Sequence, residues 1–180
     1  MDHSVNTLGA AIKSLYDVVA PAVDPTDPLA TEQLRLVSEF LGFLRSRLPY
    51  LHDRSTLELR RAVALGRTIA EAAAPVRAVD SLWEAVADGE ATLEDPRATQ
   101  CGTDLAAARV GAEMRNVIRH AAIFDDDVRS RIERAVLDDV AATMDFYRGW
   151  YAPLGFDPRP DSLPAVADAI DRLAAADARS

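Results

Sequence analysis

The sequence has a single cysteine, Cys101, and few aromatic residues, which make up 6% of its 180 positions. A lone cysteine cannot form an internal disulfide or a zinc site built from thiolates, so we expect a protein of a reducing compartment, the cytoplasm. Much of the 49% hydrophobic content is alanine. Together with the scarcity of aromatic side chains, this favours closely packed helices over a β core.

Basic residues are also in deficit, with 20 lysines and arginines against 29 carboxylates and a net charge of −9. Such a chain repels phosphate backbones and anionic lipids, so we expect neither nucleic acid nor a membrane surface as a partner. We interpret the cluster of Arg54, Arg60 and Arg61 as a solvated helix surface. No apolar run is long enough to span a bilayer, and the N-terminus lacks the basic region of a signal peptide.

The usual motifs of cofactor and metal chemistry are missing as well. There is no glycine-rich phosphate loop, no Gly-x-Ser-x-Gly sequence and no Glu-x-x-His pair, and the three histidines are not one helical turn apart. We therefore expect no cofactor and no metal, and the one alternative left open is a metal site built from carboxylates alone. The acidic triplet Asp125, Asp126 and Asp127 is interpreted as the start of a helix, where carboxylates cap amide groups and complement the helix dipole.

Apolar residues recur instead at spacings of three and four, the pattern of amphipathic helices. The stretches with this pattern are about 5–19, 28–48, 53–74, 76–88, 110–124, 127–150 and 163–173. No alternating strand pair or internal repeat is found. The sequence therefore predicts an all-α fold, a single domain over 1–180 that is a bundle of about six or seven helices. It also predicts a longer connection near 90–102, after a helix end at Gly89, and a Pro/Gly-rich loop near 151–161.

The second stretch carries the longest apolar stripe and is expected to be the central helix. The stripe and its flanks comprise Leu34, Val37, Leu41, Leu44 and Leu48, with Leu36, Phe40 and Phe43 beside them. Pro49 follows, and the chain either turns there or kinks and continues as a helix.

Polar residues on the predicted fifth helix give one candidate ligand site. Arg109, Glu113, Asn116 and His120 follow one another at spacings of four, three and four, beside an apolar stripe. At the edge of a core, His120 could exchange a proton near neutral pH while Glu113 or Arg109 orients it or a bound anion. The alternative is an exposed shoulder whose side chains bond only to one another.

For function, the sequence leaves two hypotheses. The first is a helical interaction or accessory protein that associates with itself or with a protein partner through an apolar helix face. The second is a small-molecule-binding bundle, or an enzyme, with a pocket between helices. The aromatic segment 147–151 fits a pocket or an interface, and it also fits an anchor for the loop that follows.

Overall fold

The computed structural model describes residues 3–74, 79–120 and 124–177, with side chains as far as Ala175. Within these ranges the chain forms helices and no strand, which confirms the all-α prediction. It divides into two compact units. Unit 1 contains residues 1–51 and 148–163, and unit 2 contains residues 52–147 and 164–180.

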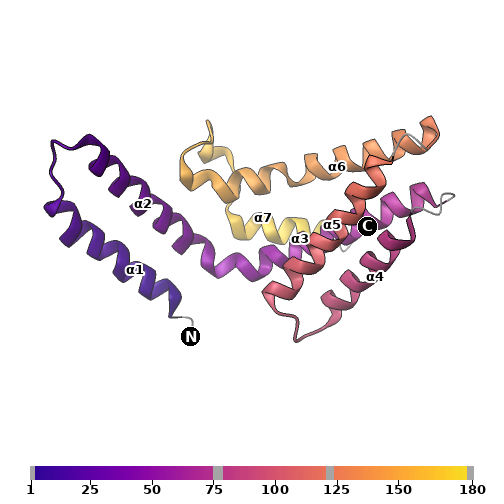
Figure 1. Cartoon of the computed structure of the whole chain (residues 1–180), viewed down its shortest axis with the longest axis horizontal. Helices are drawn as coiled ribbons and strands as arrows, with labels where there is room; N and C mark the ends of the chain where they lie inside the picture. The colour runs from indigo at the N-terminus through magenta and orange to yellow at the C-terminus, as the bar shows by residue number, and fades with distance from the viewer. Residues whose placement is uncertain (1–2, 75–78, 121–123, 178–180) are drawn as a thin grey trace. The chain divides into compact units, whose positions relative to one another are not determined.

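Unit 1 begins with a pair of helices that lie side by side, drawn in indigo and purple in Figure 1. The first, α1 (Ser4–Ser14), continues as a π turn and ends in a 3-10 turn at Ala20–Ala22. The second, α2 (Pro28–Arg47), starts where the carboxylate of Asp27 accepts hydrogen bonds from the amides of Leu29 and Ala30, both at 3.0 Å. This cap and the proline at the first helical position are the start that the sequence predicts.

Pro49 marks a turn between two helices. It lies in a 3-10 turn, Leu48–Tyr50, after which α3 (Leu51–Ala73) begins at once. Proline removes one amide donor and disfavours helix at the residue before it, and the tighter turn accommodates both effects. The chain therefore neither leaves the helical region at Pro49 nor continues there as an unbroken α-helix.

Unit 2 contains most of α3 and four further helices, among which α4 and α5 lie side by side (Figure 1). Their bounds are α4 (Asp80–Glu94), α5 (Gln100–Arg119), α6 (Asp126–Tyr151) and α7 (Val166–Asp177). The last four residues of α6 belong to unit 1, where the Pro/Gly-rich loop follows them with 3-10 turns at Ala152–Leu154 and Pro160–Ser162.

The core of unit 2 is aliphatic and is packed tightly around two glycines. Leu59, Ile69, Leu82 and Val110 are fully buried in it. A Cβ atom on Gly89 would lie 2.7 Å from Cγ2 of Val63, closer than real carbon atoms approach. Gly66 is crowded in the same way by Val110, at 2.9 Å. Glycine at these places allows α3, α4 and α5 to approach one another closely.

Gly89 also corrects the predicted connection near 90–102. The helix does not end at Gly89, because this residue lies inside α4 as a packing contact, and α4 continues to Glu94. The next helix starts at Gln100, where Thr99 Oγ1 accepts a hydrogen bond from the amide of Gly102 at 3.1 Å. The connection is therefore only about as long as an ordinary helix–helix link.

The second helix is not central, contrary to the prediction. Only Ser38, Phe43 and Arg47 are buried in α2, and α1 has no buried residue at all. The predicted helical positions 76–78 and 121–123 lie outside the described residues. No helix in the described part of the chain is long and apolar enough to cross a membrane.

Candidate functional site

The four residues of the predicted ligand site lie along α5, on or near the surface. Arg109 forms an ion pair with Asp88 of α4. Asn116 donates from Nδ2 to Glu113 Oε2 at 3.1 Å, and Nδ1 of His120 lies 2.7 Å from the carbonyl oxygen of Asn116. Arg109, Asn116 and His120 are exposed, whereas Glu113 is half-buried. The contact of Arg109 thus joins α5 to α4, whereas those of Asn116 and His120 link neighbours along the chain, and the binding role of the four residues stays a prediction.

The acidic triplet serves as the start of α6. Asp125 Oδ1 accepts a hydrogen bond from the amide of Val128 at 2.8 Å, which is the capping role that the sequence predicts. Asp126 and Asp127 pair with Arg129 and with a further arginine one turn along the same helix. Among the described residues, no group of three histidine, cysteine or carboxylate side chains is placed to hold a metal ion.

The aromatic segment at the end of α6 is joined to α2 within unit 1. Arg47 donates from Nε to the carbonyl oxygen of Trp150 at 2.8 Å and from Nη2 to that of Gly149 at 3.0 Å. The rings of Phe43 and Tyr151 stack with centroids 6.1 Å apart. These contacts satisfy carbonyl groups at the end of a helix that would otherwise lack partners.

The same segment also holds the loop that follows. Arg148 Nε donates to Asp157 Oδ2 at 2.9 Å, and the amide of Arg159 donates to Asp157 Oδ1 at 2.8 Å. These hydrogen bonds, first of all that from Arg148, lower the pKa of the Asp157 carboxyl below its usual value. The contacts are those of an anchor for the Pro/Gly-rich loop.

One surface of unit 1 has apolar side chains without cover, and we call it the open face of α2. It consists of Leu29, Leu36 and Phe40, which are 69%, 44% and 51% exposed. Their spacings of seven and four place them on one side of the helix, in line with Phe43 at the buried end. Leu36 and Phe40 lie on the flanks of the apolar stripe that the sequence predicts for a central helix, so the apolar pattern is visible in the sequence but its exposure is not.

The opposite side of α2 faces α1. The apolar residues there are only half-buried, among them Leu34, Leu41 and Leu44 on α2 and Leu8 and Ile12 on α1. A pair of helices with so little buried surface has a small core of its own, because helical stability in proteins comes mainly from packing an apolar face. Covering the open face would therefore stabilise the hairpin formed by α1 and α2.

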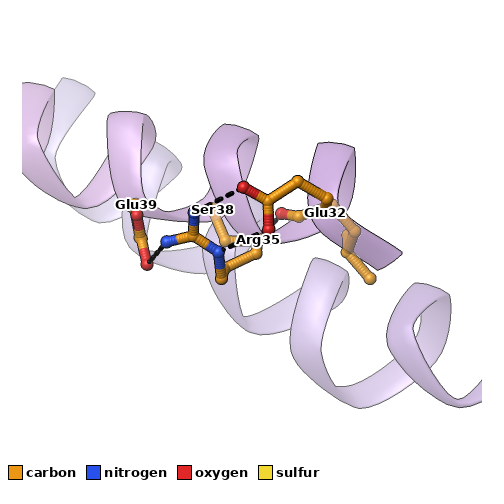
Figure 2. A network of polar contacts seen from close by, with 5 residues as sticks. Glu32, Arg35, Ser38 and Glu39 are labelled. Atoms are coloured by element: carbon orange, nitrogen blue, oxygen red, sulfur yellow. Dashed lines mark hydrogen bonds and ion pairs between the residues drawn. The ribbon is translucent and has the colours of Figure 1, made fainter. Parts of the chain in front are cut away.

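A ladder of charges, Glu32, Arg35 and Glu39, runs along α2, as Figure 2 shows. Their positions in the sequence place them on the helix beside the open face. The guanidinium of Arg35 donates to both carboxylate oxygens of Glu32, at 2.6 and 2.9 Å, and to Glu39 Oε1 at 2.6 Å. The hydrogen bond from Arg35 lowers the pKa of Glu32, and the two carboxylates raise the pKa of Arg35. Both shifts favour the charged forms of Glu32 and Arg35, and the ladder consists of a carboxylate, a guanidinium and a second carboxylate.

The excess negative charge of the chain lies mostly outside unit 1. Unit 1 holds eight carboxylate residues and six lysines and arginines, a net charge of −2 against −9 for the whole chain. Its surface is therefore close to neutral, and long-range repulsion between two copies of it is weak.

Comparison with known proteins gives no further guide, since no family model, curated protein or solved structure matches this chain.

Proposed function

We propose that this chain is a helical interaction protein that self-associates, with the open face of α2 packing against the same face of a second copy. The observation that carries the proposal is the exposure of Leu29, Leu36 and Phe40 on one side of a helix whose hairpin has almost no core. A contiguous apolar surface of this kind is typical of a protein contact. Two-fold dimers are the commonest closed assemblies, and they use one self-complementary surface.

The charges beside this face suit a second copy better than a strongly charged partner. A basic or acidic protein would gain little from a unit with a net charge near zero. The alternating ladder of Glu32, Arg35 and Glu39 carries both signs. A helix that crosses it in the opposite direction can therefore place its own Arg35 near a carboxylate of the first copy.

The energetic balance predicts a reversible dimer. Burying one leucine or phenylalanine completely contributes about 1.5–3 kcal/mol, and six half-exposed side chains would together contribute about half of their full value. Association itself costs about 4–15 kcal/mol in lost freedom. At its most favourable the difference is about 5 kcal/mol in favour of association, so we expect a weak dimer with a dissociation constant of about a few tenths of a millimolar.

The proposal also places the protein in the cytoplasm, which fits a chain whose one cysteine, Cys101, is exposed and free. It assigns no nucleic acid as a partner, because the chain carries a net charge of −9.

Sedimentation velocity on three single variants tests the proposal. Phe40→Glu places a charge in the middle of the open face and should convert the dimer to a monomer. Leu105→Glu is the matched control, since Leu105 is an exposed leucine on α5, and it should leave the dimer intact. Leu137→Glu examines a second exposed apolar surface, formed on α6 by Leu137, Val140 and Met144, and should also have no effect.

Dissociation by Leu137→Glu with an unaffected Phe40→Glu protein would move the interface to α6 and overturn the assignment to α2. Circular dichroism of each variant verifies that the helices are retained, so that a monomer produced by unfolding is recognised.

A further inference from the structure

A cavity of about 180 Å³ lies in unit 2. Its lining comes from three helices that are far apart in sequence: α3, α5 and α6. Leu65 and Met114 form part of its apolar surface, and Glu58, Asp139 and Tyr147 form part of its polar surface. An apolar surface with a few convergent polar groups is the usual composition of a small-molecule site.

Each of the two carboxylates of this cavity forms an ion pair with an arginine. Arg61 donates from Nε and Nη2 to the same oxygen of Asp139, Oδ1, at 3.0 and 2.6 Å. Arg54 Nε donates to Glu58 Oε1 at 2.8 Å. Since these bonds reach a single oxygen of each carboxylate, the second oxygens, Oδ2 of Asp139 and Oε2 of Glu58, are the acceptors that can serve a ligand.

The hydroxyl groups of the cavity have already donated their hydrogens. Tyr147 donates to Glu58 Oε1 at 3.3 Å, and Thr143 donates to the carbonyl oxygen of Asp139 at 2.9 Å. A hydroxyl that has donated its hydrogen can still accept. These hydroxyl and carboxylate groups therefore offer a ligand acceptors, and a group rich in N–H donors is the chemical match.

We propose that this cavity binds the protonated amino group of a small alkylamine, which donates hydrogen bonds to Glu58 and Asp139 while its methylene groups contact Leu65 and Met114. The volume lies below the range of about 300–1,000 Å³ that is usual for drug-sized ligands, so the ligand is short. Arg54 and Arg61 already neutralise part of the charge of Glu58 and Asp139, and Arg61 itself lines the cavity, which limits the affinity for an ammonium group to about the millimolar range.

The three methionines of the chain allow a test on the unmodified protein. Met114 lines the cavity, whereas Met144 lies exposed on α6 and serves as an internal reference. With the methionine methyl groups labelled, n-butylammonium, 1-butanol and butyrate are titrated separately and followed by NMR. The ammonium should shift the Met114 signal to saturation, the alcohol should bind about tenfold more weakly, and butyrate should not bind.

Substitution of one carboxylate adds an independent check. Glu58→Gln keeps the shape of the side chain and should weaken n-butylammonium binding about tenfold. Glu71→Gln, which changes an exposed glutamate on the same helix, should bind as the unmodified protein does. Equal binding of alcohol and ammonium, a Met114 shift that follows Met144 without saturation, or unchanged binding by a folded Glu58→Gln protein would each overturn the proposal. The comparison of the three probes decides the question even if Glu58→Gln does not fold.

Discussion

Arg47 of α2 binds the end of α6 through the backbone of Trp150, with Nε 2.8 Å from the carbonyl oxygen. Its guanidinium carbon also lies 5.5 Å from the centre of the Trp150 ring and 5.7 Å from that of Phe43. Burial lowers the pKa of Arg47, since the charged form loses hydration. Helix carbonyls and aromatic rings partly replace the lost water, so Arg47 acts as a structural clamp within unit 1.

Replacing Arg47 by alanine should therefore destabilise unit 1. The loss of two hydrogen bonds from a charged donor and of the ring contacts, less the desolvation that is relieved, amounts to about 2 kcal/mol. The measurement is urea denaturation followed by fluorescence in a Trp83→Phe background, where Trp150 is the one remaining tryptophan. Arg60→Ala, at an exposed position of α3, should change the unfolding free energy by less than about 0.5 kcal/mol. Equal changes in the unfolding free energy for the two substitutions would contradict the stabilising role of Arg47.

Two glycines in helices should respond oppositely to alanine. Gly89→Ala brings a methyl group within 2.7 Å of Val63 and should cost about 1–3 kcal/mol by overpacking. Gly42→Ala, on the exposed side of α2 with nothing within 4 Å, should stabilise the protein by about 0.5–1 kcal/mol because alanine favours the helix. Thermal unfolding of both variants measures whether each substitution raises or lowers the stability. Stabilisation by Gly89→Ala would contradict the close packing of α4.

The sequence predicted the helices well because periodicity is a property of each segment alone. It could not show which stripes are covered, and so Leu36 and Phe40 were assigned to a central helix although they are exposed. The predicted helix end at Gly89 was wrong for the same reason. A glycine can end a helix or permit close packing, and the contact with Val63, which is distant in sequence, decides between the two.

The cavity of unit 2 was beyond sequence reasoning for a related reason. Glu58 and Asp139 are 81 positions apart, and nothing in their local patterns predicts that α3 and α6 bring them to one cavity. The starts of α2 and α6 were predictable, because Asp27 and Asp125 cap amides only two or three residues away.

The hydroxyl group of Tyr147 should titrate at a higher pH than that of an ordinary tyrosine. Burial, and then the Glu58 carboxylate, raise its pKa to about 12. Since a tyrosine in the unfolded chain has a pKa of about 10, its contribution to stability should be complete below pH 10 and should decrease as the pH rises towards 12.

The phenolate absorbance of the protein, compared with that of Tyr147→Phe, isolates the titration of this residue among the four tyrosines. Glu58→Gln should lower the pKa of Tyr147 but leave it above 10, because burial is the larger cause. A titration midpoint near 10 in the folded protein would show that the hydroxyl is well hydrated, contrary to the structure.

The central claim, self-association through the open face of α2, is tested most directly by sedimentation equilibrium of the unmodified chain from about 20 μM to 2 mM, a range that brackets the expected dissociation constant. The account predicts a mass that rises with concentration from 19.5 kDa towards twice that value. A mass of 19.5 kDa over the whole range would contradict it.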